Sequence, residues 1–286
     1  MNKRLFITDL DGTLLRNDAT LSQYTYNKLN ELIANDVLIS VASARNIVSI
    51  QAILGDIQFR LPLVCSNGSL ISDYRTGKHI FARYLDAAIA RSVLDMSLHY
   101  GLQPFVASVK GGLDLVSYER VLNDGMQSYY DQRIATGDKR LRHVEHIAEA
   151  LSGEIVVFTI IGRPEHTTPL YDELVRTFGT SLCYYHFEDT YTHGYYWLMV
   201  QHSDATKANG IRELQSRFAP DTHLTVFGDN LNDLPMFAIA DTAVAVSNAP
   251  QAVRSAAEVV IGTNEDDSVI KYIEEKCHVQ KNQIAK

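Results

Sequence analysis

Two acidic segments, at residues 9–13 and 228–233, constrain the fold of this chain more than any other feature. Each follows a short apolar run, at residues 5–7 in one case and at residues 224–227 in the other. An apolar run that ends in a glycine-containing turn is typical of a buried parallel strand, and parallel sheets bind ligands beyond the carboxyl ends of their strands. We therefore predict two buried strands that end at one edge of a sheet, with acidic side chains gathered there.

The acidic side chains of these turns predict a magnesium site. If the two strands are neighbours, the carboxylates of Asp9, Asp11, Asp229 and Asp233 share a small volume, where they repel one another unless a cation lies among them. Carboxylate oxygens without a nearby cluster of histidine or cysteine favour Mg2+ over Zn2+. Mg2+ beside an aspartate that is free to react indicates phosphoryl chemistry.

Strand and helix patterns alternate at both ends of the chain. Apolar runs at residues 5–8, 37–42 and 61–65 predict buried strands, and helical spacing at 22–35 and 47–54 separates them. This series predicts a parallel sheet with right-handed crossovers, and the same rhythm returns towards the end of the chain. We therefore predict an α/β fold whose core is a doubly wound, Rossmann-like parallel sheet.

The middle of the chain differs, because its strand-like pieces and helices, one of them predicted at residues 119–133, fit an α+β domain. Both ends of the chain are needed for one sheet, so the middle segment is predicted to be inserted into the core. The predicted domains are a core domain of residues 1–84 and 193–286 and an inserted α+β cap domain of residues 85–192.

The histidines and aromatic residues of this middle segment suggest two further hypotheses, a zinc site and a sugar-binding surface. His143 and His146 have a spacing that would place them on one face of a helix, but no third zinc ligand is evident. The aromatic residues at 184–187, Tyr191 and 195–197 predict either packing in the cap domain or a surface on which a sugar stacks.

Composition excludes several classes of function. The net charge of −8 argues against non-specific nucleic-acid binding. No secretory signal is evident, and the longest apolar segment, residues 155–161, is too short to cross a bilayer, so no membrane partner is expected. Three widely spaced cysteines, Cys65, Cys183 and Cys277, fit a reducing cytoplasm and no metal–thiolate site. We expect a cytoplasmic protein that is a monomer or a homodimer.

Asp9 and Asp11 flank Leu10 where the first predicted strand ends, so both carboxylates can reach one cavity. Gly12 then allows a tight turn and a close approach of the backbone to a ligand. Such a pair can act as a nucleophile and as a general acid and base. An ordinary Asp-rich turn after a strand has the same local pattern. These residues alone therefore do not distinguish a catalytic pair of aspartates from an ordinary turn.

Four ordered segments resemble the motifs of the haloacid dehalogenase superfamily of phosphatases. They are Asp9-Leu10-Asp11-Gly12-Thr13, Ser43-Ala44-Arg45, Lys207 and Gly228-Asp229-Asn230-Leu231-Asn232-Asp233. With the inserted domain, Asn67-Gly68 after the third strand is similar to the Cof-like branch of capped sugar-phosphate phosphatases. The resemblance covers the whole chain. It implies a Mg2+-dependent phosphatase that hydrolyses small phosphorylated metabolites through an aspartyl-phosphate intermediate.

The resemblance also implies roles for single residues. Asp9 would be the nucleophile, Asp11 the general acid and base, and Lys207 the cation that offsets negative charge in the transition state. Mg2+ would be held by Asp9, by the backbone carbonyl of Asp11 and by Asp229. Asp233 would be a further ligand, direct or through water, or would hold Lys207. The residues implied to bind phosphate or substrate are Leu10, Ser43, Ala44, Arg45, Asn67, Gly68 and Asn232.

Two positions depart from the usual motifs of the family. Ser43-Ala44-Arg45 stands where Thr-Gly-Arg is usual, which keeps the hydroxyl but changes the loop, and Lys207 is followed by Ala208 in place of glycine. Alternatives also remain for the charged residues. Arg45 could contact substrate or pair with a surface carboxylate, an isolated lysine at a helix start is normally solvated, and Asp233 could cap a helix.

Three other functions are compatible with parts of this motif set. A phosphotransferase or phosphomutase would pass the phosphoryl group to a sugar hydroxyl instead of water. A carbon–halogen hydrolase does not need the second aspartate, and a non-catalytic sensor of phosphate ligands need not retain Asp11. Because Asp11 is present, the sequence favours a phosphatase, in which the cap is expected to close over the site and select the leaving group.

Overall fold

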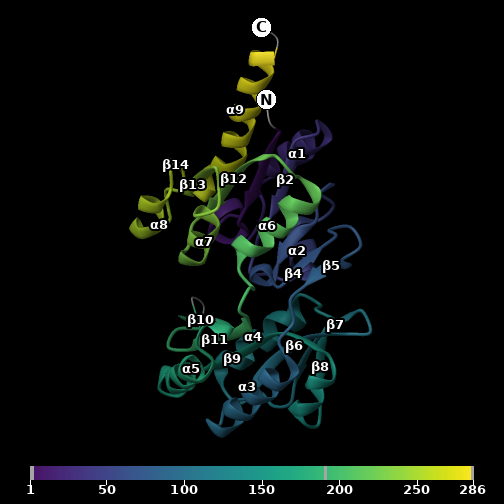
Figure 1. Ribbon diagram of the computed structural model, residues 1–286, viewed down its shortest axis with the longest axis vertical. Helices are drawn as coiled ribbons and strands as arrows, with labels where there is room; N and C mark the ends of the chain where they lie inside the picture. The colour runs from purple at the N-terminus through teal and green to yellow at the C-terminus, as the bar shows by residue number, and fades with distance from the viewer. Residues whose placement is uncertain (1–2, 190–191, 285–286) are drawn as a thin grey trace. The chain divides into compact units, whose positions relative to one another are not determined.

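The computed structural model describes residues 3–189 and 192–284, with side chains as far as residue 277. The chain forms two compact units (Figure 1). The core unit comprises Met1–Ala82 and Thr206–Lys286, and the inserted unit comprises Arg83–Ala205. The α/β fold predicted from the sequence, with a parallel-sheet core and an inserted α+β unit, is confirmed.

The core unit is built on a five-stranded sheet in which every neighbouring pair is parallel. Its strand order is β14 (Val259–Ile261), β13 (Thr242–Val246), β12 (His223–Gly228), β1 (Arg4–Thr8) and β2 (Leu38–Val41). The two strands that precede the acidic segments, β1 and β12, are therefore neighbours, with Thr8 in register with Phe227. Since they run in the same direction, both acidic segments leave the same edge of the sheet.

Local sequence signals explain where the core helices begin and end. The Ser22 hydroxyl accepts a hydrogen bond from the Thr25 N–H at 2.9 Å and caps α1, and α2 ends at Gly55, whose φ is 66°. The core helices are α1 (Gln23–Ala34), α2 (Ile47–Leu54), α6 (Lys207–Phe218), α7 (Leu234–Phe237), α8 (Gln251–Ala256) and α9 (Ser268–Ile284).

A small antiparallel sheet extends the core unit beyond β2. Ala42, directly after β2, forms a parallel bridge to Val64 in β3. After Asn67-Gly68 the chain forms a hairpin, in which β4 and β5 pair in antiparallel fashion. The strands are β3 (Leu63–Cys65), β4 (Leu70–Ser72) and β5 (His79–Ala82).

The inserted unit contains a six-stranded sheet that is antiparallel except for one parallel pair, β7 with β8. In spatial order the strands are β10 (Leu182–Glu188), β11 (Tyr196–His202), β9 (Glu154–Gly162), β6 (Pro104–Lys110), β7 (Leu113–Tyr118) and β8 (Leu141–His143). Three helices accompany it: α3 (Ala87–His99), α4 (Asp124–Ala135) and α5 (Pro164–Phe178).

Both faces of this sheet carry an apolar cluster. Leu94 of α3 and Leu170 of α5 belong to one cluster, which contains Ile160 of β9. Tyr129 of α4 belongs to the other cluster, which contains Ile161 of the same strand. Because successive side chains of a strand point to opposite faces, α3 and α5 pack on one face and α4 on the other.

The inserted unit ends at Ala205 and not at residue 192 as predicted, and it begins at Arg83 rather than at residue 85. The later end has a clear cause, since β11 lies between β9 and β10 and pairs with both. A strand pattern shows that a segment is extended, but it does not show which sheet the segment joins.

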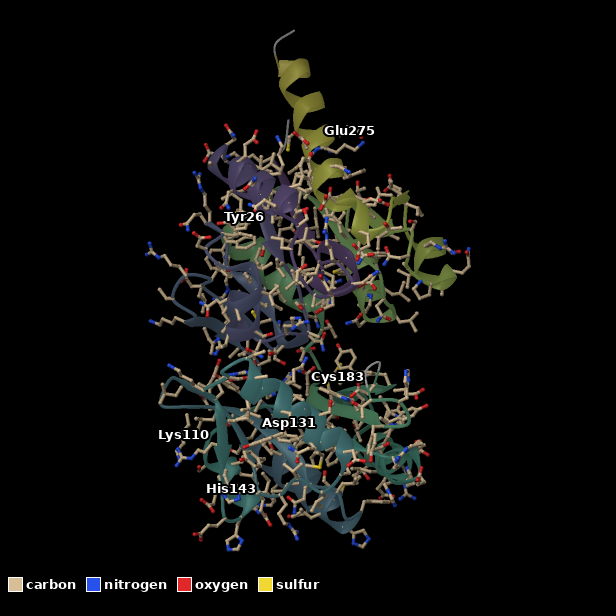
Figure 2. All side chains as sticks on the ribbon, turned by 180° about the vertical axis from the view of Figure 1, so that it is seen from behind. Tyr26, Lys110, Asp131, His143, Cys183 and Glu275 are labelled. Carbon is tan, nitrogen blue, oxygen red and sulfur yellow. The ribbon has the colours of Figure 1, made fainter. Side chains whose placement is uncertain are left out.

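The structure corrects two predictions within the inserted unit, the start of one helix and the placement of two histidines on a helix face. The helix predicted at residues 119–133 begins at Asp124, because the Asn123 side chain caps it by accepting the Met126 N–H at 2.9 Å. His143 is exposed in β8 (Figure 2). His146 precedes a 3-10 turn, so the two histidines do not share a helix face. Among the aromatic residues, Trp197 packs against Tyr129, whereas Tyr191 lies outside the described residues.

Within the described residues, no helix is both long enough and apolar enough to cross a lipid bilayer.

Candidate active site

The turn after β1 joins the ends of the two central strands of the core sheet. The Asp9 N–H donates to the Phe227 carbonyl at 2.9 Å, and the Asn248 amide donates to the Gly12 carbonyl at 2.8 Å. Gly12 has a φ of 71°, and a Cβ added there would lie 2.4 Å from Asp229 Oδ2. Both the backbone conformation and the close approach of Asp229 therefore require glycine at this position.

Three carboxylates meet where these strands end. One carboxylate oxygen from each of Asp9, Asp229 and Asp233 lies within 4.8 Å of the other two. Asp9 and Asp233 are buried, and Asp229 is partly buried. Three hard oxygen donors of this kind fit Mg2+. The side chain of Asp11, also predicted to contribute to the metal site, lies outside this group, so only its backbone carbonyl remains a predicted ligand.

Burial also changes the protonation of these acids. Burial raises the pKa of Asp9 well above its usual range, an effect that the nearby Lys207 ammonium reduces without cancelling. Burial raises the pKa of Asp229 to about 6, although the hydrogen bond from Thr13 Oγ1 to Asp229 Oδ1 at 2.8 Å opposes the change. A cation held among these carboxylates would favour their ionised forms and so oppose this effect of burial.

Lys207 lies between two of these carboxylates. Its Nζ is 2.7 Å from Asp9 Oδ1 and 2.7 Å from Asp233 Oδ1, and the lysine is only 1% exposed. Burial alone would lower the pKa of Lys207, but Asp233 and Asp9 outweigh it and hold the pKa above its ordinary value. The alternative that Lys207 is a solvated residue at a helix start is therefore wrong.

The Asp233 carboxylate accepts hydrogen bonds from Lys207 and from the backbone of the turn that follows β12. Its Oδ2 accepts the N–H groups of Asp229 and Asn230, each at 3.0 Å, while Oδ1 accepts from Lys207. A Cβ added at Gly228 would lie 2.6 Å from the Asp233 Cβ, so glycine is needed for this close packing. The contacts match the role of holding Lys207. The Asp233 side chain does not cap α7, the helix it was considered to cap, but accepts the Asn230 N–H and so caps the 3-10 turn Leu231–Asp233 that precedes α7.

The turn after β3 lies against the start of α6. Ser66, Asn67 and Gly68 all have positive φ, at 50°, 54° and 95°. A Cβ added at Gly68 would lie 2.0 Å from the Thr206 carbonyl oxygen, which belongs to the residue that caps α6. This strained turn therefore contacts the backbone that carries Lys207.

Two asparagine side chains predicted to bind substrate each have a buried amide oxygen that accepts no hydrogen bond from the described residues. Asn67 is 2% exposed, and its Oδ1 and that of Asn232 are buried without a hydrogen-bond partner in the described part of the chain. An ionised phosphate oxygen only accepts hydrogen bonds, so each amide would meet phosphate through Nδ2 and a hydroxyl or water through Oδ1. Buried amide oxygens are rarely left unpaired, which makes these two candidates for ligand contacts.

The loop after β2 places the remaining predicted residues. Ser43 is fully buried, its N–H donates to the Val64 carbonyl at 3.0 Å, and its Oγ accepts the Arg45 N–H at 3.2 Å. Ala44 is exposed. Leu10 is fully buried, so only its backbone can reach a ligand.

Arg45 pairs with Asp11. Its Nε donates to Asp11 Oδ2 at 2.7 Å and its Nη2 to Asp11 Oδ1 at 2.6 Å. Of the two roles left open for Arg45, the structure therefore shows a carboxylate pair, and the carboxylate is that of the predicted general acid. Thr13 and Asn248, which hold Asp229 and the Gly12 carbonyl, were not among the predicted site residues. Thr13 lies within the first motif, whereas no signal in the sequence indicates the role of Asn248.

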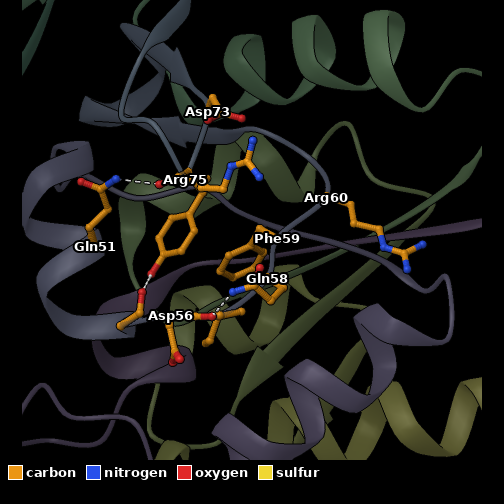
Figure 3. A pocket seen from close by; sticks show the side chains of 10 residues that line it. Gln51, Asp56, Gln58, Phe59, Arg60, Asp73 and Arg75 are labelled. Atoms are coloured by element: carbon orange, nitrogen blue, oxygen red, sulfur yellow. Dashed lines mark hydrogen bonds between the residues drawn. The ribbon is translucent and has the colours of Figure 1, made fainter.

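The core unit also has a hollow of about 560 Å³ away from these residues (Figure 3). It lies between the end of α2 and the turn that joins β4 to β5. The Tyr74 hydroxyl donates to the Gly55 carbonyl at 2.6 Å, and the Phe59 ring meets the Tyr74 ring edge-on with centroids 5.1 Å apart. None of the predicted site residues lines this hollow.

Comparison with known proteins is consistent with this site. The profile of the haloacid dehalogenase-like hydrolase family matches residues 6–273. A Bacillus subtilis 5-amino-6-(5-phospho-D-ribitylamino)uracil phosphatase is 25% identical, over 95% of this chain and 96% of its own. An Escherichia coli pyridoxal phosphate phosphatase is 22% identical, over 96% and 98%. The crystal structure of a haloacid dehalogenase-like hydrolase from Bacteroides thetaiotaomicron superposes with a TM-score of 0.78 at 20% identity, covering 96% of this chain and 99% of that one.

Proposed function

Because this chain belongs to the haloacid dehalogenase-like hydrolase family, we propose that it is a phosphoric monoester hydrolase that acts on small phosphorylated metabolites. The observation that carries this proposal is the buried contact of Lys207 with Asp9 and Asp233, beside the carboxylate of Asp229. An ammonium aimed at a nucleophilic carboxylate stabilises the charge that develops on a phosphoryl group. The two similar phosphatases named above release phosphate from small organic molecules, which supports the same substrate class here.

In the first chemical step, an oxygen of Asp9 attacks phosphorus in line with the leaving group. A phosphorus–oxygen bond to Asp9 forms while the bond to the substrate oxygen breaks, and Asp11 gives that oxygen a proton. The product is an alcohol and an aspartyl-phosphate on Asp9. Ser43 and Asn232 are proposed to hold the phosphoryl oxygens in this step, with Lys207 offsetting their charge.

In the second step, Asp11 accepts a proton from a water molecule whose oxygen attacks the same phosphorus. The bond from phosphorus to Asp9 breaks, so inorganic phosphate leaves and the Asp9 carboxylate is restored. Asp11 thus gives one proton and takes one in each cycle, which leaves the enzyme unchanged.

Asp9, Asp229 and the backbone carbonyl of Asp11 are the residues that would hold Mg2+, with Asp233 reaching it directly or through water. When bound, Mg2+ would neutralise the carboxylates and polarise a phosphoryl oxygen. Asp233 already accepts three hydrogen bonds from Lys207 and the backbone, which supports the water-mediated contact over a direct one.

The test is phosphate release from a panel of sugar phosphates, nucleotides and pyridoxal phosphate, with Mg2+ and with a chelator. We expect release that needs Mg2+ and does not need a sugar acceptor. Release only with an added sugar would indicate a phosphotransferase or phosphomutase. Binding of phosphate esters without turnover would indicate a sensor.

Asp9→Asn should abolish turnover, because an amide of the same shape is a poor nucleophile. Its thermal melt should stay near that of the wild type, since Lys207 keeps Asp233 as a partner. The matched control is Asp36→Asn, an exposed aspartate of the core unit that pairs with Arg60, which should keep the full rate. A folded Asp9→Asn protein with an undiminished rate would rule out Asp9 as the nucleophile.

A further inference from the structure

Three hydrogen bonds to protein side chains hold the Arg45 guanidinium. Nε and Nη2 form a fork on the two oxygens of Asp11, and Nη1 donates to Ser49 Oγ at 3.1 Å. Each of its three nitrogens therefore already has an acceptor from the protein. The single N–H of Nε is committed to Asp11, so the fork is the contact through which Arg45 meets the predicted general acid.

We propose that Arg45 is a positioning residue for Asp11, and that it acts on the reaction through that carboxylate rather than through substrate. The inference rests on the proposed function, in which Asp11 exchanges a proton with the leaving group. The Asp11 side chain is 48% exposed and lies outside the cluster of Asp9, Asp229 and Asp233. Unlike those three, it takes its orientation from a contact at the edge of the site.

The fork has the geometry needed to fix a direction. A planar guanidinium that donates to both oxygens of a carboxylate sets the orientation of the carboxylate plane, whereas a lysine ammonium would hold it as a point charge. Each carboxylate oxygen has two acceptor sites, so the fork leaves one on each oxygen for the leaving group or for water. Asp11 can therefore exchange a proton while Arg45 still holds it.

The orientation of Arg45 is in turn set by α2. Ser49, which accepts from Nη1, lies in the first turn of this helix, where its N–H donates to the Asn46 side chain that caps the helix. The contacts thus run from the first turn of α2 through Ser49 and Arg45 to Asp11. Since a misplaced catalytic group can lose about 100-fold in rate, a contact that only orients Asp11 should have a measurable effect.

The test is a double-mutant cycle of Arg45→Ala and Asp11→Asn, assayed with a hexose 6-phosphate and with 4-nitrophenyl phosphate. The sugar alkoxide needs a proton to leave, whereas nitrophenolate does not. Arg45→Ala should lower kcat for the sugar phosphate by about 10- to 100-fold with little change in KM, and should affect the nitrophenyl ester much less. In the Asp11→Asn background, the same substitution should change kcat by less than about twofold.

Two further variants sharpen the test. Arg45→Lys should recover only part of the rate, because an ammonium cannot form the fork. Arg60→Ala is the matched control, since Arg60 also pairs with an aspartate of the core unit, Asp36, which is not part of the acidic cluster. This substitution should leave the rates with both substrates unchanged. Thermal melts should show all variants folded, because an exposed ion pair contributes little to stability.

Four results would overturn the assignment. A higher KM for both esters that persists with Asp11→Asn would mean that Arg45 binds substrate. Equal losses of kcat for both esters would mean a structural role. A wild-type protein that hydrolyses neither ester would overturn the proposed function and this inference with it, whereas additive effects in an active enzyme would overturn the role of Arg45 alone.

Discussion

Asp229 shows at the scale of one residue how burial prepares the site for a cation. Burial raises its pKa to about 6 from an ordinary value of 3.8, and the neighbouring Asp233 adds to the rise. Between these values the folded protein keeps a proton that the unfolded chain has released. The stability that this group contributes to the metal-free protein is therefore greatest at low pH and falls as the pH rises through 6.

Mg2+ should stabilise the protein more at neutral than at acidic pH. The ion competes with the proton on Asp229, so the rise in melting temperature that it produces should be larger at about pH 7.5 than at about pH 5. Asp229→Asn should remove most of this difference. Asp36→Asn, at an exposed pair with Arg60, should leave it intact. The same rise at both pH values would show that Asp229 does not bind the ion.

The start of α6 shows how one element depends on the turn beside it. Thr206 caps the helix by accepting the Asn209 N–H at 3.2 Å, and Lys207 is its first residue. The Ser66–Gly68 turn approaches the Thr206 carbonyl so closely that only a glycine fits at position 68. The position of the Lys207 ammonium therefore depends on packing between two segments that are far apart in the sequence.

Gly68→Ala should displace α6 and reduce activity. The added Cβ would meet backbone atoms, which cannot rotate away, so Thr206 and Lys207 must move, and we expect a loss of about 100-fold in kcat. Gly55→Ala is the matched control, because Gly55 also has a positive φ, of 66°, but nothing lies within 4 Å of the added Cβ.

Gly55→Ala should lower stability by about 1 kcal/mol through its backbone strain alone and keep the wild-type rate. Melting curves and kcat, measured for both variants, distinguish the effect of backbone strain from the effect of displacing α6. If the two variants lose the same activity, contact with α6 is not what makes Gly68 necessary.

For the whole molecule, the division into two units follows from strand pairing. The core sheet draws on both chain ends, while each strand that the structure describes between Arg83 and Ala205 pairs within one six-stranded sheet. The acidic cluster, Lys207 and the Arg45–Asp11 pair all belong to the core unit. The residues proposed to carry the chemistry can therefore be separated from the inserted unit by a single deletion.

Replacing residues 83–205 with a short flexible linker should leave a folded core that binds Mg2+. We expect it to hydrolyse 4-nitrophenyl phosphate and to discriminate less among metabolites, because the inserted unit is proposed to select the leaving group. The informative comparison is deletion of residues 85–192, which keeps β11 but removes its partners β9 and β10.

That second protein should aggregate, since it exposes an unpaired apolar strand. Solubility and melting curves distinguish the two deletions. An unfolded product of the first deletion would show that the core unit does not fold by itself.

The local features of this fold could be read from the sequence, because they depend on residues a few positions apart. The helical spacing at residues 47–54 predicted α2 with its observed ends, and the helical spacing at residues 22–35 predicted α1. The apolar runs before the two acidic segments likewise predicted β1 and β12. Periodicity, capping and turn propensity act over one or two turns of chain, so they are visible in sequence.

Contacts between distant segments were decided by the tertiary structure. Nothing in the pattern of residues 196–202 shows that this strand pairs inside the inserted sheet, so the predicted boundary was too early. The motifs indicated that Arg45, Asp11 and Lys207 belong to one site. The fork on Asp11 and the burial of Lys207 between two carboxylates depend, however, on how β1, β2, β12 and α6 pack. The sequence by itself thus determined the elements and the chemical groups, whereas packing decided their partners, because the distance between two side chains depends on the fold of all the chain between them.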